Sequence, residues 1–328
     1  MRTTLLAGRF ALLSVTVLFG LSSAIAQEYP TRPITVIVPF AAGGTTDVVT
    51  RVVAEHMSRT LGQQLVIENA SGAGGTTGTT KAKRATPDGY TIMTGQMGTH
   101  AAAVGLYANL QYDPRTDFEP LGQLAGTPIL VLGRKELPAK DLKEFVAYVK
   151  ANAGKLNNGH AGVGSVSYTG CLLLNHLLGV KPALIPFNGS GPTMNALVAS
   201  QVDYMCDQSV NVVPQVQGGT IKAYAVATPE RNPALPDVPT TAEAGMPEFQ
   251  ASAWNAMFAP KGTPRPIVEK LNAAIVAALG DEGVRKRMLD LGLDIPSGSH
   301  TTPEALGELV RSEIDKWTPI IKAAGKQP

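Results

Sequence analysis

Short apolar runs alternate with helical patterns along most of this chain, and that alternation constrains its fold more than any other feature. Strands are predicted at Ile34–Val38, Leu65–Glu68 and Tyr90–Thr94, the last one after a Pro87-Asp88-Gly89 turn. Between the first two strands, apolar residues recur at the spacing of one helix face until Gly62 ends the pattern. Strands separated by helices pair in parallel and are covered by those helices, so we expect an α/β fold.

A second set of the same plan follows, and 328 residues suffice for two domains with cores of their own. Its expected strands are Ile129–Leu132, Leu156–His160, Ala183–Phe187, Val202–Cys206 and Ile221–Ala227. Helices are expected from Asp141 onward, near Tyr168–Leu178 and Thr193–Ser200, and later at Pro266–Leu279, Asp281–Leu291 and Pro303–Lys322. No flexible linker separates the sets, so we expect continuous strands to join them and the chain to cross twice. The predicted domains are residues 27–125 plus 250–328 and residues 126–249.

The N-terminus has the three parts of a secretory signal peptide, which we predict over residues 1–26. Arg2 and Arg9 are basic, Phe10–Leu21 is apolar, and Ala24-Ile25-Ala26 provides a small-x-small cleavage site. The apolar run is shorter than the roughly 20 residues that span a bilayer. We therefore expect an exported protein that resides in the periplasm.

Charge and aromatic content argue against a nucleic-acid partner. The 28 Lys and Arg residues are balanced by 26 Asp and Glu residues, and removal of the signal peptide with its two arginines leaves a formally neutral chain. Binding a phosphate backbone needs clustered basic side chains. Stacking on bases needs aromatic residues, which make up only 5% of this sequence.

Motifs for nucleotides, hydrolysis and metals are missing from the sequence. No G-x-x-x-x-G-K-[ST] or G-x-S-x-G stretch occurs, and the glycine run at 72–77 has Thr where a dinucleotide fingerprint needs its third Gly. None of the five histidines belongs to an H-E-x-x-H motif, and two cysteines provide no zinc framework. We therefore expect no cofactor and no metal ion.

The two cysteines, Cys171 and Cys206, leave two interpretations open. An oxidising compartment permits a disulfide between them, whereas buried Cys also packs as a small hydrophobic side chain. Spacing does not show whether their Cα atoms come within the roughly 7 Å that a bridge requires. Because the chain has no C-x-x-C motif, thiol redox chemistry is not expected.

Four glycine-rich loops follow expected strands, at residues 41–46, 72–76, 162–165 and 188–191. In open α/β sheets, ligands bind in the crevice beyond the carboxyl ends of the strands. A helix that begins there presents unpaired N–H groups and a partial positive charge, which suit an anion. Any one of these loops could instead be a turn or a helix cap. Four loops at equivalent positions favour a binding site.

Three polar residues near these loops are candidates with two interpretations each. Asp47 stands in the first turn of the expected helix after the first glycine loop, where it either complements the helix dipole or contacts a ligand. His100 follows an expected strand and is either a pocket donor or a residue that begins a helix. Asp207, with Gln208, ends another strand and either holds a loop across the cleft or meets the ligand.

These loops occur in the same order in a known protein family. The most telling stretches are Val38-Pro39-Phe40 through Gly43-Gly44 to Asp47 and Arg51, Glu68-Asn69 through Gly72-Ala73-Gly74-Gly75, Pro87-Asp88-Gly89-Tyr90-Thr91, Tyr112-Asp113-Pro114, Gly189-Ser190-Gly191-Pro192, Leu235-Pro236-Asp237-Val238-Pro239-Thr240 and Ala259-Pro260-Lys261-Gly262-Thr263-Pro264. Over nearly the whole mature chain, the sequence resembles the periplasmic substrate-binding receptors of tripartite tricarboxylate transporters, known as Bug receptors.

The resemblance implies a type II periplasmic-binding-protein clamshell, an α/β protein of two domains, each a mostly parallel sheet flanked by helices, without catalytic activity. It implies a small carboxylate, either a di- or tricarboxylate or an aromatic acid, in the cleft between the domains. Carried over to this sequence, the ligand-binding residues are Phe40, Ala42, Gly43, Gly44, Thr45, Asp47, Gly72, Ala73, Gly74, Gly75, Thr76, Gln96, Thr99, His100, Gly164, Ser165, Tyr168, Asn188, Gly189 and Ser190. Asp207 is added from its position at a strand end. Many relatives have His where this chain has Tyr168, so a neutral phenol replaces a group that can be charged.

The resemblance also implies a monomeric receptor that delivers its ligand to a two-subunit membrane permease. The residues agree on how the ligand is held, because the glycine loops contain no Lys or Arg and would bind an anion by backbone dipoles. Phe40, Tyr168 and Phe187 in or beside these loops would suit an aromatic or medium-chain dicarboxylate. Two alternatives stay open. The closed receptor could signal to a sensor protein, or a secreted hydrolase could use the same cleft, although no nucleophile motif supports it.

Overall fold

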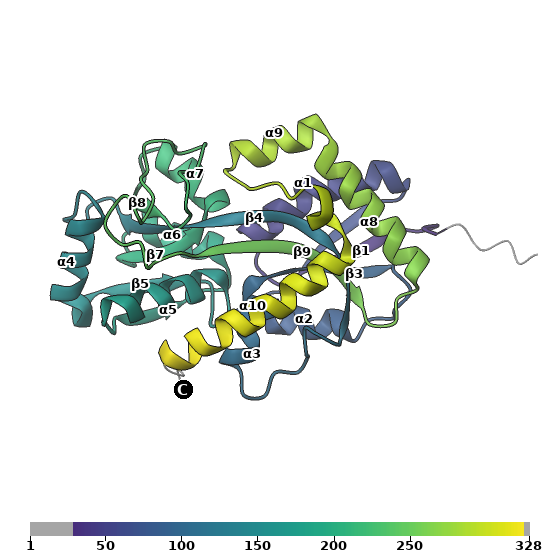
Figure 1. Cartoon of the computed structure of the whole chain (residues 1–328), viewed down its shortest axis with the longest axis horizontal. Coiled ribbons are helices and arrows are strands. Elements are labelled where there is room, and N and C mark those ends of the chain that lie inside the picture. Colours follow the sequence, from purple (N-terminus) through teal and green to yellow (C-terminus); the bar gives the residue numbers. More distant parts are fainter. Residues whose placement is uncertain (1–28, 325–328) are drawn as a thin grey trace, which may run out of the picture.

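The computed structural model describes residues 29–324, so the predicted signal peptide lies outside the described residues. The chain forms two lobes that lie next to each other along the longest axis, with two long strands running through the middle (Figure 1). None of the helices in the described range combines the length and apolar character that a membrane span requires.

One mixed sheet of nine strands runs through both lobes. Its strands are β1 (Ile34–Val38), β2 (Leu65–Asn69), β3 (Thr91–Gln96), β4 (Phe118–Arg134), β5 (Asn157–His160), β6 (Ala183–Pro186), β7 (Tyr204–Gln208), β8 (Ile221–Val226) and β9 (Ser252–Pro260). The order is β2-β1-β3-β9-β4-β7-β5-β6, and β8 also pairs with β4. Parallel pairing joins β2, β1 and β3 in the first lobe and β7, β5 and β6 in the second, whereas β4, β8 and β9 pair antiparallel. This topology confirms the predicted α/β clamshell.

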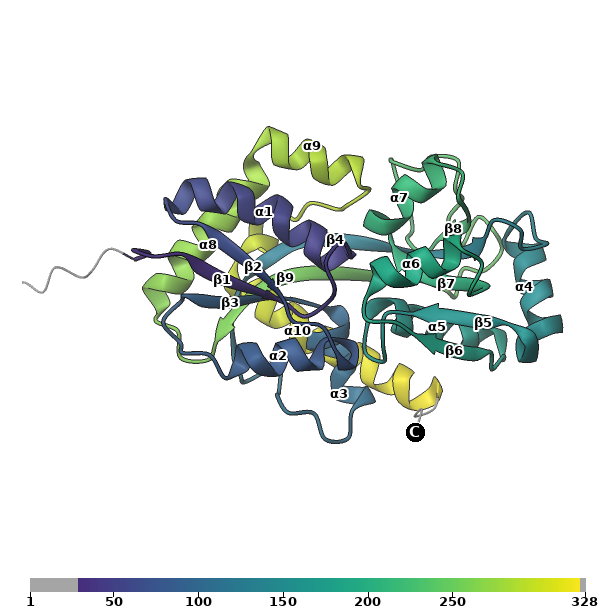
Figure 2. The ribbon, with the colours of Figure 1, turned by 180° about the vertical axis from the view of Figure 1, so that it is seen from behind.

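Helices cover both faces of the sheet. They are α1 (Thr45–Leu61), α2 (Thr76–Lys83), α3 (Ala103–Leu106), α4 (Leu142–Asn152), α5 (Val166–Leu178), α6 (Ser190–Val198), α7 (Ser209–Gln217), α8 (Arg265–Gly280), α9 (Glu282–Asp290) and α10 (Pro303–Ala324), with single turns η1 (Ala73–Gly75), η2 (Gly98–Ala102), η3 (Ala153–Lys155) and η4 (Gly298–Thr301). In the first lobe, α1, α8 and α9 lie on one face and α2, α3 and α10 on the other (Figures 1 and 2). Alternate residues of β1 serve the two cores: Ile34 and Val36 pack toward α1 and α8, and Ile37 packs in the core that includes α10.

Strand β4 is the structural link between the lobes. Its first part pairs with β9 from Phe118 to Pro128, and its last part pairs with β7 and β8. The predicted strand, Ile129–Leu132, covers only the last part of β4. Residue types that usually interrupt a strand occur in the earlier part, at Pro120, Gly122, Gly126 and Pro128. The strand accommodates the early breakers through two register shifts against β9, as bulged strands do. The chain enters the second lobe along β4 and returns at β9, as predicted.

Three segments were not expected from the sequence. Strand β9 has no alternation of polar and apolar side chains, because it is buried on both faces between β3 and β4. Helix α7 contains Pro214 in its second turn, where proline removes one backbone hydrogen bond, and packing on β4 and β8 holds this short helix in place. Residues 98–106 form η2 and α3 against the last helix, α10, whose end also reaches α5 of the second lobe.

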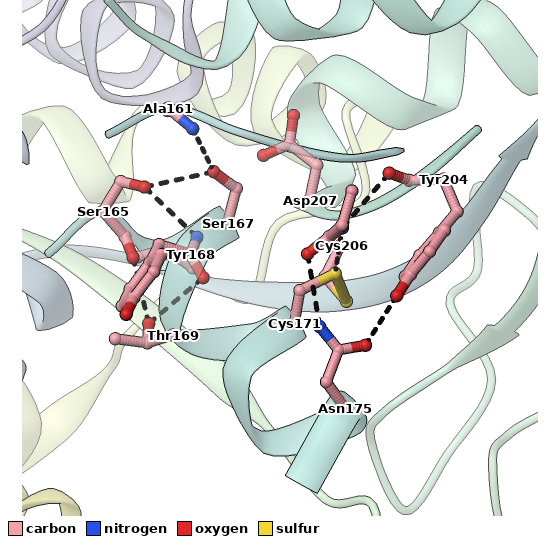
Figure 3. The surroundings of a disulfide bond; sticks show 12 residues. Ala161, Ser165, Ser167, Tyr168, Thr169, Cys171, Asn175, Tyr204, Cys206 and Asp207 are labelled. Atoms are coloured by element: carbon pink, nitrogen blue, oxygen red, sulfur yellow. Dashed lines mark hydrogen bonds between the residues drawn. A yellow bond between two sulfur atoms is a disulfide. The ribbon is translucent and has the colours of Figure 1, made fainter. Parts of the chain in front are cut away.

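The two cysteines form a disulfide inside the second lobe (Figure 3). Cys171 lies on α5 and Cys206 on β7, both fully buried, with Cα atoms 5.3 Å apart. One helical turn further along α5, Asn175 accepts a 2.7 Å hydrogen bond from the hydroxyl of Tyr204, also on β7. Helix and strand are therefore joined at two neighbouring positions, and the structure takes the bridged alternative of the two that the sequence leaves open.

We predict that replacing both cysteines by Ala lowers the free energy of unfolding by about 3–4 kcal/mol, because a bridge across 35 residues restricts the unfolded chain. Urea unfolding monitored by circular dichroism measures the difference. Reductant should shift the midpoint of the wild type toward that of the double variant and leave the variant unchanged. An intact mass that shows two free thiols in unreduced protein would contradict the bridge.

Candidate functional site

Four helices begin at one small cavity between the lobes. Its lining comes from the first turn of α1, the first turn of α5, the first residue of α6 and the residue before α7, together with Phe40 and Gln96. The lining residues are Phe40, Gly44, Thr45, Thr46, Gln96, Ser165, Val166, Ser190 and Gln208, and in the closed lobes they leave a cavity of only about 10 Å³, the space of about one water molecule. We call this space the inner cavity. The four starts meet because parallel strands of both lobes end at edges that face each other.

The inner cavity offers hydrogen-bond donors without a positive side chain. The first N–H groups of a helix have no partner within it, and at α1, α6 and α7 no side chain caps the helix start. The buried hydroxyl of Thr45 has no hydrogen-bond partner among the described residues. No Lys or Arg of the described range lines the cavity. Converging helix starts favour an anion, which they stabilise through aligned backbone dipoles.

A second and larger space adjoins the first at Phe40, whose ring lines both. This outer cavity, of about 400 Å³, is lined by Phe40, Gly72, Ala73, Gly74, Gly75, Tyr107, Ala161, Gly162, Val163, Pro186, Phe187 and Asn188. Its side chains are mostly apolar or aromatic, so it differs in character from the inner cavity.

The two lobes are closed upon each other, and they touch largely through backbone atoms. The amide of Ala41 donates to the carbonyl oxygen of Asn188 across the cleft at 3.3 Å. A Cβ atom on Gly74 would lie only 1.6 Å from the carbonyl oxygen of Val163, and one on Gly98 would lie 2.1 Å from that of Gly164. Glycine at 74 and 98 therefore permits a closure that any other residue would obstruct.

Asp47 holds the first glycine loop in place. Its carboxylate accepts 2.9 Å hydrogen bonds from the amide of Gly43, the Nε of Arg51 and the Nδ2 of Asn69. The same Asn69 amide donates to the carbonyl oxygen of Phe40 at 3.0 Å. Burial acts to raise the pKa of Asp47, but these donors outweigh it and hold the pKa below its usual range. The side chain positions the loop and does not line either cavity.

Asp207 positions the start of α7 in the same way. Its carboxylate, fully buried near the disulfide (Figure 3), accepts hydrogen bonds from the amide of Gln208 at 2.9 Å and the Nδ2 of Asn211 at 3.1 Å. Burial raises its pKa to about 6, although Asn211, Gln208 and Ser190 act to lower it. It supports Gln208, which lines the inner cavity, without lining the cavity itself.

Two further predicted ligand residues, His100 and Tyr168, line neither cavity. The ring of His100 stacks on Phe258 with centroids 4.0 Å apart, and burial lowers its pKa to about 3, so the imidazole is neutral and part of the core. Tyr168 packs against His160 with centroids 5.0 Å apart, and it borders a separate pocket with Leu172 and Asn175 on the far part of α5. Local spacing could not reveal these side-chain directions, because packing against other elements decides them.

The other predicted residues lie at or beside the two cavities. The inner cavity brings together Phe40, Gly44, Thr45, Gln96, Ser165 and Ser190, and the outer one brings together Gly72, Ala73, Gly74, Gly75 and Asn188. The rest line neither cavity but are close in sequence to residues that do: Ala42, Gly43, Thr76, Thr99, Gly164 and Gly189.

Several lining residues were not among the predicted ligand contacts. Thr46, Val166 and Gln208 extend the inner cavity, and each is a direct neighbour in sequence of a predicted residue. Phe187 was noted only as an aromatic residue beside a loop. Tyr107, in the outer cavity, has no local signal, since it follows a short helix far from any glycine loop. Within residues 29–324, no cluster of three or more His, Cys, Asp or Glu side chains could hold a metal ion.

Comparison with known proteins agrees with this geometry. The profile described as "Tripartite tricarboxylate transporter family receptor" matches residues 49–326. The chain belongs to this receptor family. The resemblance read from the glycine loops is thereby confirmed.

Solved structures of similar receptors share the whole fold. MatC from Rhodopseudomonas palustris, solved with bound malate, is 52% identical and has a TM-score of 0.88, with coverage of 89% of this chain and 100% of that one. The periplasmic binding protein BugD is 44% identical with a TM-score of 0.88, covering 91% of this chain and 100% of that one. A UPF0065 protein from the TAR-I ttuE-ttuC' intergenic region of Agrobacterium vitis is 42% identical over 315 residues, which are 96% of this chain and 90% of that protein.

We predict that Asp207 opposes stability as pH rises from about 4 to 6, whereas the buried neutral His100 and His160, with pKa values lowered to about 3 and about 4, favour it over the same window, so the effect of Asp207 is measured against a variant that lacks its carboxyl. Its folded pKa of about 6 exceeds the unfolded value near 3.8, so in this window the folded state binds more protons than the unfolded state. The side chain of Asp207→Asn does not ionise. Between pH 4 and pH 7, the free energy of unfolding of this variant should therefore rise relative to that of the wild type by up to about 3 kcal/mol. Urea unfolding at several pH values measures this gain. A difference between the two proteins that is the same at every pH would contradict it.

Proposed function

We propose that this protein is a periplasmic receptor that binds a small dicarboxylate between its lobes and delivers it to a membrane permease. The convergence of four helix starts on the inner cavity carries the proposal. A four-carbon dicarboxylate is the first candidate, since the 52% identical MatC was solved with malate. The family description, a receptor of a tripartite tricarboxylate transporter, supports delivery to a permease.

In this proposal, the lobes part to admit the ligand and close on it, so that one carboxylate meets the N–H groups of α1 and α6 and the hydroxyl of Thr45 where the structure leaves about 10 Å³. A micromolar affinity corresponds to about 8 kcal/mol. About three to five hydrogen bonds to a charged group, each worth about 1.5–3 kcal/mol, are enough to reach it. Since no buried ion pair must be broken, opening of the lobes exposes the ligand to water and releases it.

We assign the lobes to residues 27–125 plus 250–328 and to residues 126–249.

The hydroxyls in the cavity support binding in preference to hydrolysis. Ser165 donates to the carbonyl oxygen of Gly162 at 2.7 Å and accepts from the amide of Tyr168, so it acts as a helix cap. Among the described residues, the side chain of Ser190 hydrogen-bonds to that of Asp207, and neither Ser165 nor Ser190 has a hydrogen bond to a histidine. A serine nucleophile needs such a base. We therefore propose a receptor without catalytic activity.

Isothermal titration against malate, succinate, adipate, citrate and benzoate tests the ligand class. We expect the dicarboxylates to release or absorb measurable heat and the uncharged analogue succinamide to give none, because the helix starts stabilise negative charge. The protein must first be unfolded, dialysed and refolded to remove any acid carried through purification. If no carboxylate binds to protein treated in this way, the proposed function is wrong.

Gly44→Val should weaken carboxylate binding by at least about 10-fold, which is about 1.4 kcal/mol. A Cβ atom at this position would stand 3.7 Å from the amide nitrogens of Ser190 and Gly191, where donors of both lobes face each other. The φ angle of Gly44 is −80°, so valine causes no left-handed strain and the fold should persist. Gly280→Val, with nothing within 4 Å of its Cβ, is the matched control. If the two variants bind the carboxylate with equal affinity, the binding site does not lie at Gly44.

A further inference from the structure

Tyr107 spans the cleft from the first lobe to the second. It follows α3, and its ring lines the outer cavity beside the loop between β5 and α5. Its hydroxyl lies 2.9 Å from the carbonyl oxygen of Ala73, in its own lobe. The same hydroxyl forms a hydrogen bond with the carbonyl oxygen of Val163, in the opposite lobe. Tyr107 is the side chain whose hydroxyl joins the second glycine loop to the third.

The hydroxyl has two acceptors but only one proton. A phenol donates to one carbonyl oxygen at a time or shares its proton between two. Burial raises the pKa of Tyr107 to about 12, so the group stays protonated and remains a donor. If the lobes part, the Val163 oxygen moves away and the Ala73 oxygen remains. The hydroxyl therefore has a partner in both states, and opening leaves no buried donor unpaired.

The opposite lobe is shaped to receive this ring. A Cβ atom on Gly164 would lie 3.0 Å from Cε2 of Tyr107, and the φ angle of Gly164 is +92°, a value that favours glycine. On the near side, a Cβ atom on Gly74 would collide with the Val163 carbonyl that Tyr107 binds. Glycines of both lobes thus leave the room that the phenol fills in the closed form.

We propose that Tyr107 is a latch that stabilises the closed form of the receptor and sets the rate at which the ligand leaves. Tyr107 does not line the inner cavity, so it acts on the closure of the lobes and not on the carboxylate itself. The part that concerns ligand release rests on the proposed function, whereas the closure of the lobes can be measured without any ligand.

Tyr107→Phe removes only the hydroxyl, and Tyr112→Phe provides a matched control. The hydroxyl of Tyr112 donates to the carbonyl oxygen of Thr99 at 2.8 Å, and both residues belong to the first lobe. Both variants therefore lose one phenol-to-carbonyl hydrogen bond, but only Tyr107→Phe loses one that crosses the cleft. We expect small-angle X-ray scattering without ligand to give a larger radius of gyration for Tyr107→Phe than for the wild type and the control. Equal radii for all three proteins would overturn the latch.

Stopped-flow fluorescence of the tryptophans with malate tests the second part. Malate should dissociate from Tyr107→Phe about 3- to 10-fold faster than from the wild type, with little change in association, since the closed form of the variant buries the Val163 carbonyl oxygen without the hydroxyl that donates to it. Gly164→Ala, which pushes on the ring from the other lobe, should act in the same direction. An unchanged dissociation rate in both variants would overturn the latch. If the wild type binds neither malate nor another carboxylate, the proposed function is wrong. The scattering result alone then shows whether Tyr107 stabilises the closed form.

Discussion

The close approach of two lobes through bare backbone is the constraint on which the rest of this structure depends. Gly74 faces the carbonyl of Val163, and Gly98 faces that of Gly164, at separations that leave no space for a Cβ atom. Because the loops meet at this range, the starts of α1 and α6 come from different lobes yet share one cavity. Glycine thus has a double role here, since it exposes N–H groups toward the cavity and permits the lobes to close over it.

Two buried carboxylates keep these loops in position, and their surroundings drive their pKa values in opposite directions. Asp47 has a guanidinium, an amide side chain and a backbone N–H as donors, which hold its pKa below its usual range. Asp207 has only neutral donors in a fully buried place, so burial dominates and its pKa rises to about 6. Both accept hydrogen bonds at the beginning of a helix that lines the inner cavity. Two acids thus hold the helix starts at the inner cavity without lining the cavity themselves.

Much of the architecture and most of the candidate site could be predicted from local patterns. The alternation of strands and helices, the four glycine loops and the double crossing between lobes were all visible in the sequence and agree with the structure. The length of β4 was not, because a bulged strand accepts prolines and glycines that normally end one. Helix α7 was missed for a similar reason, since Pro214 hides it. In both cases a partner strand compensates for a local breaker.

The sequence by itself determined the order of the elements, the composition of the loops and the neutral character of the cavity, because each depends on residues close together in the chain. Only the tertiary structure decided where side chains point: His100 into an aromatic core, Tyr168 toward a separate pocket, and Tyr107 across the cleft to Val163. It also paired Cys171 with Cys206. Contacts between residues far apart in sequence arise from the packing of whole lobes, and no local pattern of residue types encodes that geometry.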